Sequence, residues 1–311
     1  MPRHTTRRTI LTALTATAAH SLFSPTLLRA DQDPDWTTPL PPFRIAGNLY
    51  YVGSRDLASY LITTPQGHIL INSNLITSPP QIRASVEKLG FHWKDVKILL
   101  ISHAHSDHCA GSAQILRETG AKYTIMDGDV PVVESGGKAD FQYGHRPEFL
   151  YPPAKVSRIL HDGDHVTLGD TTLVAHKTAG HTKGCTTWTM TAYEGGKGLN
   201  AVIVGSPNVN PGYNLVHDPK YPQMAADYAA GFRTLTSLPC DLFLGAHGLY
   251  FDLLAKYARL QSSSTNPFLD PAGYHAYITE RKQAFETELL RQRSQPKRKP
   301  SQSKPNSSQQ S

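Results

Sequence analysis

Short apolar runs alternate with amphipathic stretches through most of the chain. The continuous apolar run Val96–Ser102 is typical of a buried strand. In Pro80–Leu89 apolar residues recur at helical spacing, which predicts a helix. Other helices are predicted at Gly111–Glu118, Tyr221–Leu238 and Ala272–Arg293. Runs bounded by turn residues predict strands at Leu49–Val52, Ser59–Thr63, His68–Asn72, Lys122–Met126, Val156–Leu160, Val166–Leu168, Thr172–Lys177, Thr186–Thr191, Ala201–Val204 and Leu242–Leu244.

The order of these elements predicts an α/β fold. Two strand-rich halves are each associated with helices, which suggests two sheets packed face to face with helices outside. The connection Ser135–Pro153 is long and rich in Gly, Pro and aromatic residues. Long loops in compact domains are often lids, so we expect this segment to cover a site.

The basic charge of the chain lies in its two ends. The net charge of the 311 residues is +6, with four arginines and no acid in residues 1–30 and six Lys or Arg and no acid in residues 291–311. Subtracting these ten charges leaves −4 for the rest. A mildly acidic core argues against a nucleic-acid-binding domain, so no nucleic-acid partner is expected.

The N-terminus has the features of an export signal. Arg7 and Arg8 precede the short apolar stretch Ile10–Ala19, and the pair resembles a twin-arginine signal. We therefore expect residues 1–30 to be an export signal and the protein to be periplasmic. The alternative is a disordered basic N-terminus. Residues 294–311 are polar and basic and predict a disordered tail, which leaves residues 31–293 as the folded domain.

Composition excludes several other classes of protein. No apolar run approaches the roughly 20 residues of a bilayer-spanning helix, so no integral membrane segment is expected. Three cysteines cannot form a disulfide framework. The unusual count is histidine, at 15, because several of these residues lie close together in the sequence.

The densest histidine cluster directly follows the predicted buried strand. In the six residues His103-Ala104-His105-Ser106-Asp107-His108, four side chains are potential metal ligands. Imidazole and carboxylate suit zinc, which needs three protein ligands and one open position in a catalytic site. The alternative, a solvated polar loop, explains poorly why so many ligands follow an apolar strand.

Two later histidines complete two sets of ligands. His181, within Thr178-Ala179-Gly180-His181-Thr182, and His247, within Gly245-Ala246-His247-Gly248, each follow a predicted strand among small residues. Either alone would be an ordinary loop histidine. Together with the first motif they predict two Zn²⁺ ions, one held by His103, His105 and His181 and the other by Asp107, His108 and His247.

The motifs HAHSDH, AGHT and GAHG, in this order, resemble the metallo-β-lactamase superfamily. The resemblance extends from about Trp36 to Arg293 and implies a four-layer αββα sandwich with a dinuclear zinc site at one edge of the sheets. In that family a loop like Ser135–Pro153 overhangs the zinc ions.

The position after Ala201–Val204 distinguishes the branches of the superfamily. Thioesterases, lactonases and nucleases of this superfamily usually carry a metal-bridging Asp there, and class B1 β-lactamases carry a Cys. Here Val204-Gly205-Ser206 offers neither ligand. The resemblance therefore implies that His108 binds the second zinc ion in their place, as in subclass B3. Further matches to that subclass are Trp36, Gly180-His181-Thr182 with Gly184, Pro211-Gly212-Tyr213 and Leu238-Pro239-Cys240-Asp241.

Three positions depart from the pattern of the family. Asn72 stands where many relatives have Asp, which would alter hydrogen bonds behind the ligands. Cys240 has no later cysteine with which to form the disulfide of some subclass members. Cys185 follows Gly184 where serine is frequent, and we expect it to be a packing residue.

The resemblance implies a zinc-dependent β-lactamase that confers antibiotic resistance by hydrolysing the amide of penicillins, cephalosporins or carbapenems. Zinc lowers the pKa of a shared water to about 7, and Asp107 would orient the resulting hydroxide. Tyr213 would donate its hydroxyl to the oxyanion. Ser206, Asn208 and Asn210 would bind the substrate carboxylate, although each of these four residues could also be an ordinary turn residue.

The formal charge of the site supports an anionic small-molecule substrate. Two zinc ions, Asp107 and one hydroxide give about +2. The alternatives are another zinc hydrolase of the same fold, a lactonase or thioesterase, and a zinc-storing module without activity. We expect a monomer.

Overall fold

The computed structural model describes residues 33–295. The predicted export signal and all but the first two residues of the predicted basic tail lie outside this range. Within it, no helix is long and apolar enough to cross a membrane.

Seven strands form the first sheet, in the order in which they occur in the chain. The strands β1 to β4 are antiparallel to one another, and β4 to β7 are parallel. The parallel part therefore brings the carboxyl ends of β4, β5 and β6 to one edge. The strands are β1 Phe43–Ala46, β2 Leu49–Tyr51, β3 Tyr60–Thr64, β4 Gly67–Ile71, β5 Val96–Leu100, β6 Lys122–Met126 and β7 Arg158–Leu160.

The second sheet has five strands in the order β12-β11-β10-β9-β8. Neighbours are antiparallel except β11 and β12, which are parallel. The sequence alternates here between side chains that face the first sheet and side chains that face the outer helices or solvent. The strands are β8 His165–Leu168, β9 Thr171–Lys177, β10 Thr186–Glu194, β11 Lys197–Val204 and β12 Leu242–Gly245.

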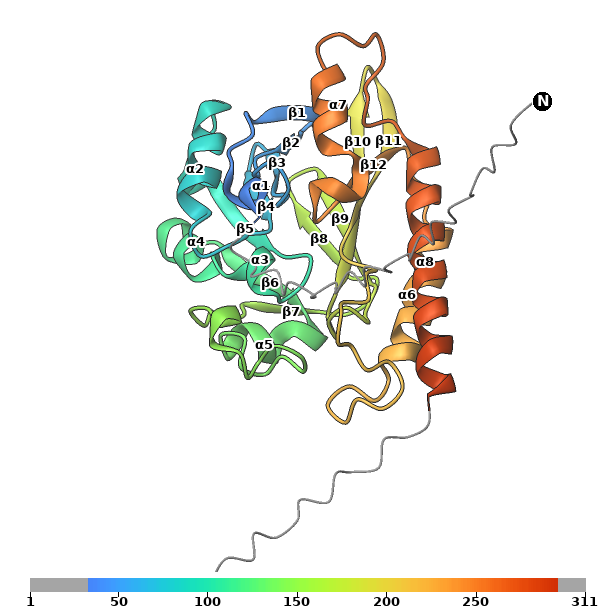
Figure 1. The fold of residues 1–311 in the computed structure, drawn as a ribbon. Helices are drawn as coiled ribbons and strands as arrows, with labels where there is room; N and C mark the ends of the chain where they lie inside the picture. Colours follow the sequence, from blue (N-terminus) through green and yellow to red (C-terminus); the bar gives the residue numbers. More distant parts are fainter. Residues whose placement is uncertain (1–32, 296–311) are drawn as a thin grey trace, which may run out of the picture.

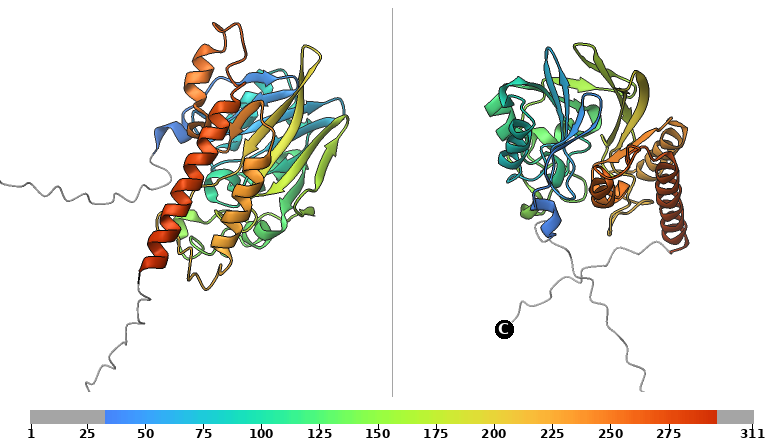
Figure 2. Two further views of the ribbon diagram at one scale, coloured as in Figure 1. Left: turned by 90° about the vertical axis from the view of Figure 1, so that its right-hand side faces the viewer. Right: turned by 90° about the horizontal axis from the view of Figure 1, so that it is seen from above.

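Helices cover the outer face of each sheet, which gives the four-layer αββα sandwich expected from the sequence (Figure 1). The helices α2, α4 and α5 lie on the side of the first sheet, and α6 and α8 lie together on the side of the second (Figure 2). The helices are α1 Pro34–Thr37, α2 Pro79–Lys88, α3 Ser106–Cys109, α4 Ser112–Thr119, α5 Val130–Glu134, α6 Met224–Ser237, α7 Leu253–Arg259 and α8 Pro271–Ser294.

Two apolar cores hold the layers together. On β4, Ile69 and Ile71 face the second sheet and join a core that includes Trp188, while Leu70 points the other way, toward Val86 of α2. The indole N–H of Trp188 donates to the carbonyl of Ile101 at 3.0 Å, which links the two sheets just before the histidine motif begins. Packing therefore fixes the edge of the sandwich at which the motif lies.

Most predicted elements are confirmed with boundaries shifted by one or two residues. The helix predicted from Tyr221 begins at Met224, because Pro222 disfavours helical backbone at the residue before it. The short elements α1, β1, α5 and α7 were not predicted, since four to seven residues are too few to show a period. Single 3₁₀ turns occur at Trp93–Asp95, Asp127–Asp129, Pro147–Phe149 and Gly248–Phe251.

Candidate metal centre

The predicted ligands meet at one edge of the sandwich. His103 and His105 follow β5, His181 lies in the turn between β9 and β10, and His247 follows β12. Asp107 lies on the single-turn helix α3 together with His108.

Glycine at position 180 lets His181 approach the other ligands. The φ angle of Gly180 is +133°, which disfavours other residues. A Cβ at this position would lie 2.5 Å from Cγ of Tyr228, so the backbone packs directly against that ring. The small residue in the AGHT motif is thus required both by backbone conformation and by space.

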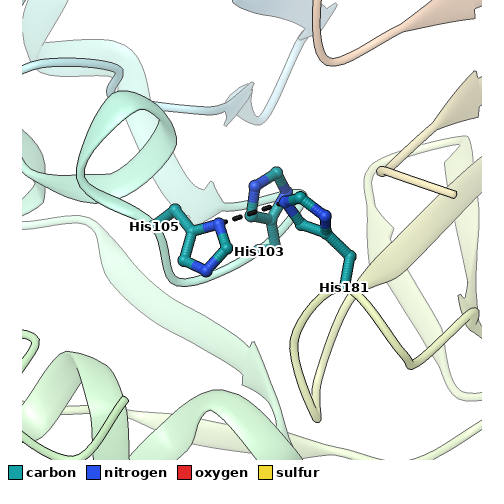
Figure 3. Close-up of side chains that lie close together, drawn as sticks. All are labelled: His103, His105 and His181. Atoms are coloured by element: carbon teal, nitrogen blue, oxygen red, sulfur yellow. Dashed lines mark hydrogen bonds between the residues drawn. The ribbon is translucent and has the colours of Figure 1, made fainter. Parts of the chain in front are cut away.

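Three imidazoles converge in the first group of ligands, as Figure 3 shows. The ring of His103 lies 4.9 Å from that of His105 and 4.6 Å from that of His181, centroid to centroid. Nδ1 of His105 lies 3.1 Å from Nε2 of His181. One nitrogen from each ring falls within a group whose members all lie within 4.8 Å of one another.

The second group of ligands adjoins the first. Nε2 of His108 lies 3.1 Å from Nε2 of His247, and Oδ2 of Asp107 lies 3.1 Å and 3.4 Å from these two nitrogens. His103 lies between the two groups, because its ring centroid is 4.3 Å from that of His108. One ligand atom from each of His103, Asp107 and His108 also lies within 4.8 Å of the other two, close enough to share a metal.

The donor atoms fit zinc. Three nitrogens at about 2.0 Å from a tetrahedral zinc ion are about 3.3 Å apart. The nitrogen pairs of 3.1 Å in both groups are close to this spacing. The buried Nδ1 of His108 has no hydrogen-bond partner among the described residues, and its Nε2 faces the other ligands. The structure thus holds a metal site built from imidazole nitrogen and one carboxylate.

Acceptors behind the ligands fix which ring nitrogen faces inward. Oδ2 of Asp56 lies 2.8 Å from Nδ1 of His247, and its Oδ1 accepts the backbone N–H of Leu249. The carbonyl of Asn208 lies 2.8 Å from Nδ1 of His181. Hydrogen bonds of this kind leave the opposite nitrogen free to bind metal.

Asp140 connects His105 to the predicted lid. Its Oδ2 lies 3.6 Å from Nε2 of His105, and its Oδ1 accepts the backbone N–H groups of Gln142 and Tyr143. The Tyr143 ring lies 5.2 Å from the His105 ring in an edge-on arrangement. The segment predicted as a lid thus contacts a ligand side chain directly.

Asp129 joins the two loops that carry the first group of ligands. Its carboxylate accepts hydrogen bonds from the backbone N–H of Ala104, the hydroxyl of Thr182 and the backbone N–H of Gly184. Burial raises the pKa of Asp129 to about 6, although these hydrogen bonds favour the charged form. This carboxylate sets the spacing between the His103–His105 segment and the His181 turn.

The protonation of the free ligands reflects burial and neighbouring acids. Burial lowers the pKa of His103, and it lowers that of His181 to about 3, so both rings are neutral as a metal requires. Burial also acts on His247, but hydrogen bonds to Asp107 and Asp56 outweigh it and raise the pKa to about 9. Burial opposes ionisation of Asp107, yet His108 and His247 hold its pKa well below the usual range.

A cavity of about 800 Å³ opens over the ligands. His105, Asp107, His181 and His247 line its floor. Its walls include aromatic side chains from the N-terminal segment, the lid and the segment after β12, namely Trp36, Tyr143, Phe149, Tyr151 and Tyr250. Such a mixture of apolar walls and a few polar groups is typical of small-molecule sites.

The predicted substrate contacts divide into two pairs. Asn208 and Asn210 line the cavity, as expected of residues that could touch a ligand. Ser206 is 2% exposed, does not line the cavity, and its hydroxyl lies 3.2 Å from that of Tyr250. In this structure the Ser206 hydroxyl therefore contacts Tyr250 and not the cavity, and its role as an anchor for the substrate carboxylate stays a prediction.

Tyr213, the predicted oxyanion donor, lies against the backbone of His181. Its side chain is 3% exposed and absent from the cavity wall, and its hydroxyl donates to the carbonyl of His181 at 2.8 Å. To donate to an oxyanion, this hydroxyl would have to leave the His181 carbonyl, and that role stays a prediction. Tyr213 instead holds the backbone of a ligand residue.

Sequence reasoning missed the three supporting carboxylates and Tyr250. Asp56, Asp129 and Asp140 lie outside the three histidine motifs, and an isolated Asp carries no local signal of such a role. Asn72 lies behind the ligands, where its Oδ1 accepts the backbone N–H of Ser102, the residue before His103, at 2.7 Å. Cys109, Cys185 and Cys240 are free and buried.

Comparison with known proteins agrees with this geometry. The sequence model of the metallo-β-lactamase superfamily matches residues 56–191. A curated relative, a probable metallo-hydrolase of Burkholderia pseudomallei, is 32% identical over 114 residues, which is 37% of each chain. The chain thus matches little more than a third of the length of that relative.

Solved structures match much more of the chain. Native FEZ-1 metallo-β-lactamase from Legionella gormanii is 54% identical, with a TM-score of 0.82, over 83% of this chain and 98% of that one. BJP-1, a subclass B3 metallo-β-lactamase of Bradyrhizobium japonicum, is 37% identical (TM-score 0.78; 84% and 97% covered). The class B3 di-zinc enzyme LRA-12 from an Alaskan soil metagenome is 35% identical (TM-score 0.79; 83% and 97% covered). The chain therefore belongs to the metallo-β-lactamase superfamily, with its solved relatives in subclass B3.

Proposed function

We propose that the protein is a zinc-dependent β-lactamase that hydrolyses the β-lactam amide of penicillins, cephalosporins or carbapenems. The observation that carries this proposal is the second group of ligands. His108 lies against Asp107 and His247, whereas Ser206, at the position of the bridging Asp or the Cys of other branches, is buried against Tyr250. The 54% identity to FEZ-1 over nearly all of that enzyme supports the same conclusion.

The proposed cofactor is a pair of zinc ions. His103, His105 and His181 would hold one ion, and Asp107, His108 and His247 would hold the other. Zinc, when bound, supplies an activated water and a Lewis acid for attack on the lactam carbonyl. No cysteine lines the described cavity wall, and Ser106 is the only serine that does.

The protein's own side chains orient the reacting groups. Asp107 remains ionised and its Oδ2 lies beside Nε2 of both His108 and His247, so its carboxylate can orient the attacking water. Each side-chain amide of Asn208 and Asn210 gives one N–H to a tyrosine hydroxyl, of Tyr250 and Tyr143 respectively. A primary amide has a second N–H, which both asparagines can present to the carboxylate of the substrate.

Turnover and metal content test the proposal together. We expect the purified protein to bind two zinc ions and to hydrolyse a chromogenic cephalosporin. Chelator should abolish the activity and added zinc should restore it. Hydrolysis of a lactone or thioester with no β-lactam cleavage would instead indicate another hydrolase of the fold. Bound zinc without turnover of any of these substrates would indicate a storage protein.

We also propose that residues 1–30 direct export to the periplasm and that the mature protein is a monomer. The paired Arg7 and Arg8 before a short apolar stretch support the export route. Expression of the full chain in strains with and without the twin-arginine system tests it, because the periplasmic fraction should contain β-lactamase activity only in the former. Size-exclusion chromatography with light scattering tests the monomer.

A further inference from the structure

The cavity over the ligands contains one permanently positive side chain. Among the described residues that line it, Arg146 is the only arginine or lysine. Four aspartates also line the cavity, but three of them face histidines, namely Asp56, Asp107 and Asp140. The fourth, Asp33, accepts the backbone N–H of Asp35 and lies on the side of the cavity near Leu249. Arg146 is thus the cation that an anionic ligand meets away from the metal ligands.

Aromatic contacts fix where Arg146 lies relative to the metal centre. The Tyr143 ring lies 5.2 Å from the ring of His105, and the Phe149 ring lies 4.7 Å from that of Tyr143. The guanidinium of Arg146 lies 4.5 Å from the centroid of Phe149. Two aromatic rings therefore separate Arg146 from His105. The carboxylate on the ring system of a β-lactam lies beside the reacting amide, whereas the acyl side chain extends away from it.

The ion pair of Arg146 leaves donors for a second carboxylate. Nε and Nη2 both donate to a single oxygen, Oε1 of Glu148. A guanidinium has five N–H donors in a planar fork, so the Nη1 side can engage another anion. The side chains of Arg146 and Glu148 are 34% and 49% exposed, and such surface pairs contribute only about 0–1 kcal/mol. The pair therefore positions Arg146 without consuming its capacity to bind.

We infer that Arg146 determines substrate specificity by binding an acidic group on the acyl side chain of the β-lactam. This inference rests on the proposed β-lactamase function. The Phe149 face below the guanidinium limits its movement, and the apolar wall formed by Tyr143 and Phe149 receives the rest of the side chain. Substrates with a side-chain carboxylate gain this contact, and otherwise identical substrates without one do not.

A pair of penicillins that differ by one carboxylate tests the inference. Carbenicillin is benzylpenicillin with an added carboxylate on its side chain. The measured quantity is the ratio of kcat/KM for carbenicillin to kcat/KM for benzylpenicillin. Since Arg146 is partly exposed, we expect Arg146→Gln to lower this ratio roughly twofold to fivefold at low salt. The ratio for Arg146→Lys should lie between those of the wild-type protein and Arg146→Gln, because lysine keeps the positive charge but lacks the planar, forked N–H donors of arginine. The effect should shrink as salt screens the charge.

A matched control separates a local contact from the general charge of the lid. Lys138 is exposed on the same segment and does not line the cavity. We expect Lys138→Gln to leave the ratio unchanged. Provided that the variants still hydrolyse benzylpenicillin, two results would overturn the inference. One is an unchanged ratio in Arg146→Gln, and the other is an equal change of the ratio in Lys138→Gln. Failure of the zinc-loaded wild-type protein to hydrolyse any β-lactam would instead overturn the proposed function.

Discussion

Replacement of Asp56 by asparagine isolates one interaction behind the second group of ligands. The side-chain oxygen of Asn can still accept the N–H of Leu249, and the backbone bonds of residue 56 to Asp35 and Gly248 do not depend on its side chain. What changes is the atom 2.8 Å from Nδ1 of His247, where an accepting carboxylate oxygen becomes a donating NH₂ group. Two donors then face each other, which favours the wrong tautomer of His247.

The structure sets the expected magnitude. In the wild-type protein Asp56 holds the proton on Nδ1, so that Nε2 of His247 faces Nε2 of His108 and the carboxylate of Asp107. Loss of a hydrogen bond behind a metal ligand typically lowers metal affinity 10- to 100-fold, about 1.4–2.8 kcal/mol. We therefore expect Asp56→Asn to bind the second zinc ion 10- to 100-fold more weakly and the first ion nearly as well as before.

Competition with a chromophoric chelator measures both affinities, and turnover at increasing zinc shows whether excess metal restores activity. Asp270→Asn is the matched control. It weakens an ion pair with the buried Lys256 and a helix cap at Gly273, both outside the cavity. It should lower the melting temperature and leave zinc affinity intact. If Asp56→Asn binds two zinc ions with wild-type affinities, Asp56 does not control the tautomer of His247.

Three further predictions follow from the same geometry. Asp140→Asn should lower the affinity for the first zinc ion instead of the second, because Asp140 faces Nε2 of His105. The same chelator competition measures this change. Tyr213→Phe should lower stability by about 1–3 kcal/mol in urea unfolding by leaving the His181 carbonyl unsatisfied. It should lower kcat by less than about tenfold, whereas loss of a true oxyanion donor costs about 100- to 1,000-fold. In the metal-free protein, the pKa of His247 near 9 lies above its unfolded value of about 6.5, so its stabilisation is complete below pH 6.5 and is lost as the pH rises through 9. Urea unfolding across this range should show a loss of up to roughly 3 kcal/mol, and an increase would contradict the assignment.

The ligands could be predicted from the sequence because their signal is local. His103, His105 and His108 fall within six residues after an apolar strand, and Gly180 and Gly248 mark the backbone at His181 and His247. The fold followed from the same kind of evidence, since short apolar runs bounded by turn residues indicate strands along the chain. The elements that pattern alone missed, such as α1 and α5, are little longer than one helical turn and depend on tertiary contacts for their stability.

The supporting residues could not be predicted, because their roles depend on distance in space. Asp56 is 191 positions from its partner His247, and Asp129 is 55 positions from Gly184. The resemblance to a family named Ser206 and Tyr213 as cavity residues but carried no information on burial. In the fold, the Tyr250 hydroxyl contacts Ser206, and the backbone of His181 takes the hydroxyl of Tyr213. Packing, which only the structure shows, therefore decides which polar residues can reach a substrate.

The same buried acids change the electrostatic case for an anionic substrate. The sequence suggested a formal site charge of about +2 with two zinc ions, Asp107 and one hydroxide. The structure adds Asp56 and Asp140, the two buried acids that face ligand side chains. Burial opposes their ionisation, but His247 and His105 lower their pKa values, and their two negative charges bring that count to about zero. Long-range attraction from the metal centre is then weak, because a neutral cluster exerts little field beyond its own diameter. Recognition of a carboxylate must come from groups that touch it, such as the amides of Asn208 and Asn210 near the ligands. Along the described cavity wall, Arg146 is the only Arg or Lys that can bind a second acidic group of the substrate, farther from the metal ligands.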